Sequence, residues 1–275
     1  EIPEYKLLNF SMTLNEFKVI YFWEYIHRLL GRIIGLFYIL PLLFFTFKKR
    51  IKKKDLLNFY SIFFLICFQG FIGWYMVKSG LSERTDVSHY RLSLHLTIAF
   101  IIFILLTLNY LKYKNYNYYI TGSKLPLNLP WFFTLILLLQ ISMGALVSGL
   151  DAGQIYQTWP LMNQNYFPDD SLLSDLVTLE SLETPSLVQF LHRNISYFIL
   201  FIFIIIALLI FKNNEFIHLK KIGLLIFLAL LLQIILGIFT VLSGAQIILA
   251  SMHQIGSIFL ITSSLILVFK NSRIN

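Results

Sequence analysis

The stretch Ile222-Gly-Leu-Leu-Ile-Phe-Leu-Ala-Leu-Leu-Leu-Gln-Ile-Ile-Leu-Gly-Ile-Phe-Thr-Val-Leu242 decides the fold class. It contains no charged residue, and it is as long as the run of about 20 apolar residues that a membrane-spanning helix needs. Six other segments are also long and mainly apolar, with few charges and those near their ends: 24–47, 56–77, 92–111, 129–149, 190–211 and 249–269. We therefore expect an all-α membrane protein with seven spans, the first of which starts in a polar stretch and runs longer than the bilayer is thick.

The composition excludes other classes of protein. Of the 275 residues, 57% are hydrophobic and only 13% are charged, whereas about a quarter of the residues of a soluble domain are charged. A soluble enzyme and a disordered chain are therefore excluded, and the single cysteine, Cys67, excludes a disulfide scaffold. In a membrane protein, a net charge of +8 reflects which loops lie on the inner side and does not indicate nucleic-acid binding. We expect membrane lipid around the chain and no nucleic-acid partner.

The basic residues are concentrated in every second connection. Four segments together hold most of the 22 basic residues and few of the 14 acidic ones: 48–55, 112–128, 212–221 and 270–275. By the positive-inside rule these segments lie on the inner side, so residue 1 lies outside and residue 275 inside. An eighth span is then expected before residue 1. We expect a multi-pass protein of the bacterial inner (cytoplasmic) membrane in preference to the mitochondrial inner membrane, because no organelle presequence is seen.

The chain contains an internal repeat. The motif Glu24-Tyr-Ile-His27-Arg28 recurs as Gln189-Phe-Leu-His192-Arg193. In both halves the next span carries a Gln-x3-Gly motif, and the span after that opens with a histidine. These later pairs are Gln69-x3-Gly73 with Gln233-x3-Gly237, and His95 with His253. Such duplication predicts two pseudo-symmetric four-helix transmembrane bundles: residues 1–128, lacking the first helix, and residues 129–275, which open with a third Gln-x3-Gly at Gln140.

Four histidines occupy equivalent places near the outer ends of spans: His27, His95, His192 and His253. Within each half the two histidine helices run in the same direction, so the two imidazoles face one bundle interior at similar depth. Such a pair suits ligation of a heme iron from both sides. Zinc or copper is the rival interpretation, but no carboxylate or thiolate is placed to complete a tetrahedral site in both halves.

The neighbours of the histidines favour a flat, anionic macrocycle. The residue four positions after each histidine is small: Gly31, Ala99, Ser196 and Ser257. Arg28 and Arg193 directly follow a histidine, where a guanidinium could pair with a heme propionate.

The two halves differ at one acidic position. Glu24 shares a helix face with His27, whereas Gln189 occupies this place in the second half. One carboxylate in an otherwise matched pair suggests that the first heme site performs chemistry, with Glu24 handling a proton or positioning water, while the second carries electrons. A carboxylate that simply pairs with Arg28 one turn later is the alternative.

These motifs resemble the heme A synthase family, in its alphaproteobacterial and mitochondrial branch. The resemblance covers nearly the whole chain and rests on seven stretches: Glu16–Arg32, Gln69–Leu81, Val87–His95, Gly144–Gly153, Trp159–Met162, Val188–Arg193 and Met252–Gln254. It implies an eight-helix membrane oxidoreductase that converts heme O to heme A, for cytochrome oxidase, by oxidising a ring methyl group to a formyl group.

The resemblance also implies roles for the site residues. His192 and His253 would ligate a bound heme b, with Arg193 beside it. His27 and His95 would hold the substrate heme, with Arg28 adjacent and Glu24 important for turnover. Heme O synthase, cytochrome oxidase assembly factors and a second copy of the chain are the partners that we expect.

Two other functions remain open from the sequence. A diheme b-type electron-transfer subunit would explain both histidine pairs, but not the lone Glu24. A transporter or assembly scaffold, in which the histidines only bridge helices, would bind no heme.

Overall fold

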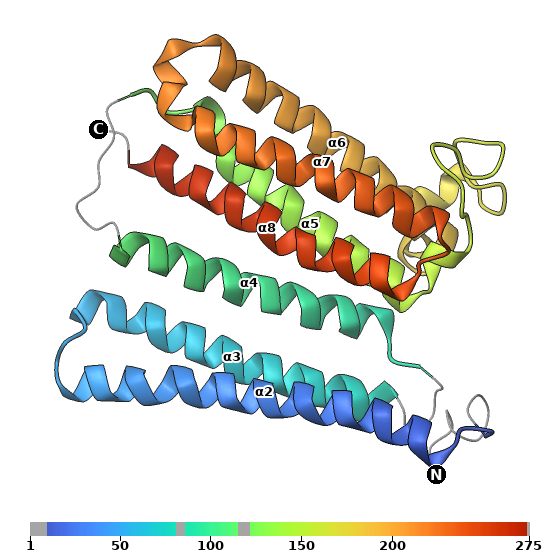
Figure 1. Cartoon of the computed structure of the whole chain (residues 1–275), viewed down its shortest axis with the longest axis horizontal. Coiled ribbons are helices and arrows are strands. Elements are labelled where there is room, and N and C mark those ends of the chain that lie inside the picture. Colours follow the sequence, from blue (N-terminus) through green and yellow to red (C-terminus); the bar gives the residue numbers. More distant parts are fainter. Residues whose placement is uncertain (1–9, 81–85, 115–121, 274–275) are drawn as a thin grey trace. The chain divides into compact units, whose positions relative to one another are not determined.

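The computed structural model describes residues 10–80, 86–114 and 122–273 (Figure 1). Seven helices in these segments are long and apolar enough to cross a membrane. Their bounds are α2 (Leu14–Phe47), α3 (Lys53–Gly80), α4 (His89–Lys114), α5 (Leu129–Gly149), α6 (Pro185–Lys212), α7 (Lys220–Leu242) and α8 (Ile247–Ser272). Each predicted span coincides with one helix, which confirms the all-α, multi-span fold class.

The chain divides into two compact units, residues 1–102 and 103–275. The division falls inside α4, so the predicted boundary between residues 128 and 129 stays a prediction. The two units are described separately below.

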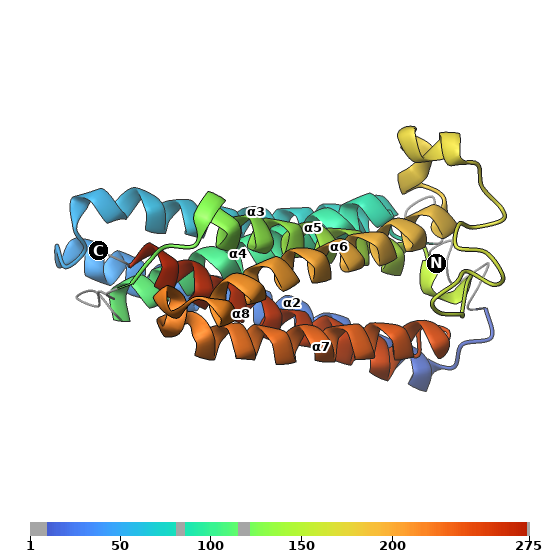
Figure 2. The same cartoon turned by 90° about the horizontal axis from the view of Figure 1, so that it is seen from above.

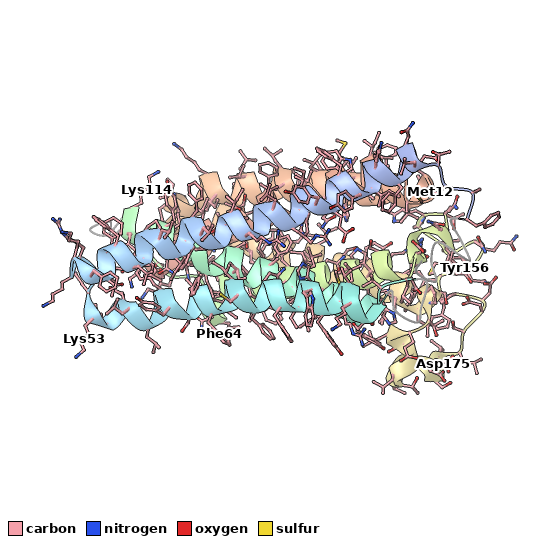
Figure 3. The ribbon with its side chains drawn as sticks, turned by 90° about the horizontal axis from the view of Figure 1, so that it is seen from below. Met12, Lys53, Phe64, Lys114, Tyr156 and Asp175 are labelled. Carbon is pink, nitrogen blue, oxygen red and sulfur yellow. The ribbon has the colours of Figure 1, made fainter. Side chains whose placement is uncertain are left out.

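In the first unit, α2 and α3 form a hairpin whose ends are marked by Met12 and Lys53 (Figure 3). Tyr38 fastens the two helices, because its hydroxyl donates to the carbonyl of Phe59 at 3.0 Å and its ring stacks on Phe63. Both contacts join residues of neighbouring helices, so the hairpin is held by side chains near its closed end.

Helix α2 begins ten residues before the predicted span. Thr13 and Glu16 form a capping box, in which each side chain accepts a hydrogen bond from the other's backbone N–H, and this satisfies donors that a helix start leaves free. With 34 residues the helix is about 50 Å long, well beyond the roughly 30 Å of a bilayer core. His27 consequently lies in the fourth turn of its helix, whereas His95, His192 and His253 lie in the second turn of theirs.

In the second unit, α5, α6, α7 and α8 form a four-helix bundle (Figures 1 and 2). Helix α5 packs against α6 and α8, and α7 packs against the same two helices. Successive helices run in opposite directions, so α6 and α8 run the same way. The centre of the bundle is fully buried and apolar, with Phe133, Phe203, Ile226 and Leu265 among its largest side chains. The bundle therefore presents the beginnings of α6 and α8, with their histidines, at one end.

The connection between α5 and α6 lies at this end of the bundle (Figure 2). It contains three short 3-10 helices, η2 (Ala152–Gln154), η3 (Leu173–Val177) and η4 (Leu179–Leu182). Figure 3 labels Tyr156 and Asp175 within it. We call residues 150–184 the outer loop.

Candidate functional site

The structure brings the two histidines of the first unit together. The ring centres of His27, on α2, and His95, on α4, are 6.5 Å apart, and the ring planes meet at 68°. Metal–imidazole bonds are about 2 Å long, so one iron between two imidazoles places the ring centres about 6 Å apart. The observed spacing therefore fits two axial ligands of a single iron.

Open space lies beside His27 on its own helix. A Cβ atom added to Gly31 or Gly35 would meet no other atom within 4 Å. These glycines follow His27 by one and two turns on the same side of α2. The open strip leaves room for the flat face of a macrocycle, and the predicted role of the small residues stays a prediction.

The second unit holds His192 and His253 on the parallel helices α6 and α8. In His95, His192 and His253 alike, Nδ1 is buried and has no hydrogen-bond partner among the described residues. Buried polar atoms are normally satisfied, so these nitrogens fit the need of a metal ligand.

No cluster for a free metal ion competes with this interpretation. Over residues 10–80, 86–114 and 122–273, no group of three or more His, Cys, Asp or Glu side chains could hold an ion. Paired histidines suit an iron whose four remaining ligands come from a macrocycle, which favours heme over zinc or copper.

Glu24 and Arg28 form an ion pair on α2. Arg28 Nη1 donates to Glu24 Oε1 at 2.6 Å, and both side chains are nearly half exposed. The pairing offered as an alternative by the sequence is therefore present. The ion pair holds the carboxylate of Glu24 one turn before His27. The role of Glu24 in turnover and the pairing of Arg28 with a propionate stay predictions.

The equivalent pair in the second unit is buried and serves the outer loop. Gln189 donates to the backbone carbonyl of Tyr156 at 3.1 Å, and Arg193 donates to the same oxygen at 2.9 Å. Arg193 also donates to the carbonyls of Thr158 at 2.9 Å and Leu161 at 3.3 Å. Its remaining donor, Nε, is buried without a partner within the described part of the chain.

Arg193 thus carries a buried positive charge to which the described residues offer carbonyl dipoles as hydrogen-bond partners. The residue is 8% exposed, and a buried charge is costly unless it is paired. An anionic group that accepts from Nε would remove this cost. A heme propionate, as predicted from the sequence, has the required chemistry.

Tyr156 is the centre of the outer-loop contacts. Its side chain is buried, and its hydroxyl donates to the carboxylate of Asp169. Burial, the hydrogen bond to Asp169 and the charge of Asp170 raise the pKa of Tyr156 to about 12. The phenol therefore stays neutral at physiological pH and joins two parts of the loop. The sequence analysis missed this residue, because no motif marks the loop residues that meet α6.

The sequence analysis also left the Gln-x3-Gly motifs without a role. The amide nitrogen of Gln69 lies 3.3 Å from Nε2 of His95, and that of Gln140 lies 3.2 Å from Nε2 of His192. The repeat itself was the signal, since these motifs recur on the helix before His95, His192 and His253.

The comparisons with known proteins agree with the site. Residues 1–265 match the family model COX15-CtaA, cytochrome oxidase assembly protein. The chain belongs to this family. This match confirms the family resemblance that the motifs indicated, and it covers nearly the whole chain.

Curated relatives of this family member carry the name heme A synthase. The one from Pelagibacter ubique (strain HTCC1062) is 47% identical over 99% of this chain and 80% of the relative. Those from Rickettsia bellii (strain OSU 85-389) and Rickettsia felis are 44% and 42% identical, over 94% of this chain and 78% and 77% of the relatives. No solved structure matches significantly.

Proposed function

We propose that this chain is a heme A synthase, an oxidoreductase that converts heme O to heme A for cytochrome oxidase. The observation that carries the proposal is the 47% identity to a heme A synthase over 99% of the chain. A shared fold alone does not define an activity, so the proposal also rests on the site. Two histidine pairs at equivalent places in a duplicated chain provide one position for a cofactor and one for a substrate.

The second histidine pair, His192 and His253, binds the cofactor heme b. Support comes from their Nδ1 atoms and from Nε of Arg193, which are buried and have no hydrogen-bond partner in the part of the chain that the structure describes. The Arg193 Nε–H is suited to a propionate. When bound, heme b supplies one-electron transfer. The residues of the chain orient it, since Arg193 and Gln189 hold the outer loop to the helix that carries His192.

The first pair, His27 and His95, binds the substrate heme. The spacing of 6.5 Å between the rings would let both imidazoles hold one heme iron, and the open strip beside Gly31 leaves room for a macrocycle. Glu24 stands three residues before His27 and is held by Arg28. Its carboxylate would handle a proton or position water beside the bound substrate, so Glu24, His27 and His95 are the catalytic residues.

The chain works in the bacterial inner membrane with both sites near the outer face. The seven apolar helices show a multi-pass membrane protein, and the charge distribution supports this orientation. The substrate bundle comprises residues 1–128 and the cofactor bundle residues 129–275. Heme O synthase would deliver the substrate, assembly factors of cytochrome oxidase would receive the product, and a second copy of the chain is a further partner.

Heme analysis of the purified full chain tests this function. We expect tightly bound heme b, which is lost in His192→Ala or His253→Ala and kept in His27→Ala. Added heme O should gain the mass change of formyl formation in the wild type, but not in His27→Ala. Because the last variant keeps its cofactor, it controls for general loss of folding.

The other outcomes would assign a different function. Heme b in both sites, with heme O left unchanged in mass, would identify a diheme electron-transfer subunit. A folded chain that binds no heme would identify a transporter or assembly scaffold. The difference between Glu24 and Gln189 at equivalent positions argues against both.

A further inference from the structure

The Gln-x3-Gly motifs have no role in the function described so far. They lie on α3, α5 and α7, each of which precedes a helix that carries a histidine. The three pairs are Gln69 with Gly73, Gln140 with Gly144, and Gln233 with Gly237. Since residues four apart share a helix face, each motif presents an amide and a bare stretch of backbone one turn apart.

Each glycine lies directly against an imidazole. A Cβ atom at Gly73 would lie 2.8 Å from Cε1 of His95. At Gly144 and Gly237 the corresponding distances, to Cε1 of His192 and of His253, would be 3.2 and 3.1 Å. Carbon atoms in contact prefer about 3.5–4.0 Å. A side chain at Gly73 would therefore force His95 to move, and one at Gly144 or Gly237 would push the ring away by a few tenths of an ångström.

Other glycines of the same helices show that this closeness is specific. A Cβ atom at Gly70, on α3, would meet nothing within 4 Å, and one at Gly223, on α7, would make only ordinary contacts of 3.5 Å. The glycines of the motif are thus distinguished by the histidine that they face.

The glutamines contact the same rings. The amides of Gln69 and Gln140 lie next to Nε2 of His95 and His192, at 3.3 and 3.2 Å. Gln140 also donates to the backbone carbonyl of His192 at 3.0 Å, which fixes the amide on α6.

On α7 the arrangement is a variant of this pattern. The Gln233 side chain instead fills a notch on α8, where a Cβ atom at Gly256 would come within 2.0 Å of its amide nitrogen. Helices α7 and α8 therefore interlock, with His253 against Gly237 and Gln233 against Gly256.

The amide can support an imidazole that binds a metal. In Gln69 and Gln140, Oε1 is buried without a partner in the described segments. A half-turn of the Gln69 amide brings this acceptor to the ring of His95, so that Nε2–H donates to Oε1 and Nδ1 keeps its lone pair. Gln140 keeps its bond to the backbone carbonyl of His192 and holds the place of the ring through its contact at Nε2. A hydrogen bond at one ring nitrogen fixes the tautomer and orientation with which the other binds a metal.

We propose that the Gln-x3-Gly motifs of α3, α5 and α7 are seats for His95, His192 and His253. In each seat the glycine admits the ring, and on α3 and α5 the glutamine is a positioning residue that aims the ring at heme iron. This proposal rests on the proposed function, which assigns heme to these histidines. It goes further because it names residues on three additional helices that control how iron is held. The seats of α5 and α7 serve the cofactor, and that of α3 serves the substrate.

The test uses the full chain purified with its heme, and compares heme b content, absorption and paramagnetic resonance spectra, and midpoint potential. Gly237→Ala should weaken heme b retention about 10-fold, the usual scale for a residue that supports a metal ligand. Gly223→Ala, on the same helix, should leave retention unchanged. Gly73→Ala should likewise weaken heme O binding while Gly70→Ala does not.

The glutamine is tested by its effect on the bound heme. Gln140→Glu places a carboxylate beside Nε2 of His192 and makes the imidazole a stronger electron donor, so the midpoint potential of heme b should fall. Gln140→Leu removes both the contact at Nε2 and the bond to the carbonyl of His192, so the ring is held less firmly and the spectrum and potential of heme b should shift. A glutamine that only packs helices together would leave spectrum and potential unchanged in both variants.

Three outcomes would overturn the proposal, and they are distinguishable. If the wild type binds heme b and both Gln140 variants keep its spectra and potential, the proposed role of the glutamine is wrong while the proposed function stands. Equal heme retention in Gly237→Ala and Gly223→Ala does the same for the glycines. No heme b in the folded wild type overturns the proposed function, and the seats with it. If Gly237→Ala does not fold, the two Gln140 variants decide.

Discussion

Arg193 donates a hydrogen bond from Nη2 to the backbone carbonyl of Tyr156 at 2.9 Å, and so ties helix α6 to the outer loop. Gln189, one turn earlier, donates to the same oxygen. His192 lies between these two residues on the helix. The element that positions the predicted heme ligand is therefore also the element that holds the loop.

Replacing Arg193 should loosen the outer loop and reduce heme b retention. Arg193→Met removes three hydrogen bonds from a charged donor, and such bonds contribute about 1.5–3 kcal/mol each. We expect faster hydrogen exchange in residues 150–162, together with partial loss of heme b. Arg28→Met, at the equivalent place of the first unit, is the matched control and should leave this exchange unchanged. Equal exchange in both variants would contradict the role given to Arg193.

Replacing Glu24 should affect turnover without affecting stability. The Glu24–Arg28 pair is nearly half exposed, so it contributes at most about 1 kcal/mol to folding. A carboxylate that transfers a proton contributes about 100-fold or more to the rate. Glu24→Gln should therefore keep heme b and its unfolding temperature, while heme A formation falls about 100-fold. Arg28→Gln, which keeps the carboxylate, should cause a smaller loss. Full turnover in Glu24→Gln would disprove the catalytic assignment.

Tyr156 should make stability depend on alkaline pH. Its pKa is raised to about 12 in the folded chain, whereas an unfolded tyrosine titrates near pH 10. The folded state therefore holds this proton more tightly. The resulting stabilisation is complete below about pH 10 and is lost as the pH rises to about 12. The phenolate absorbance of wild type minus Tyr156→Phe should show this late titration. A difference spectrum that titrates near pH 10 would refute it.

The spans and the histidine pairs could be predicted because they depend on patterns along the chain. Long apolar windows correspond to membrane helices, and a duplicated motif places equivalent residues at equivalent positions. The start of α2 could not be read in this way. It depends on the capping box of Thr13 and Glu16, which lies in a polar stretch outside the apolar window.

Contacts between segments were beyond the sequence pattern. The repeat identified Gln140 and Gly144, but only the packing of α5 on α6 shows that they meet His192. The partners of Arg193 are backbone carbonyls, and every residue has one. No residue type could therefore mark them in advance, and the guanidinium was matched from the sequence to a propionate alone.

Cysteine labelling should establish the orientation of the second unit. The single cysteine, Cys67, can be replaced by serine to give a background without thiols. Ser174 and Asn213 are both exposed and lie beyond opposite ends of α6. The positive-inside rule places the lysine-rich end, with Asn213, inside and the outer loop, with Ser174, outside. In intact cells a membrane-impermeant maleimide should therefore label Ser174→Cys, and should label Asn213→Cys only after permeabilisation. The reverse pattern would place His192 and His253 near the inner face. The proposed orientation of both heme sites would then be wrong.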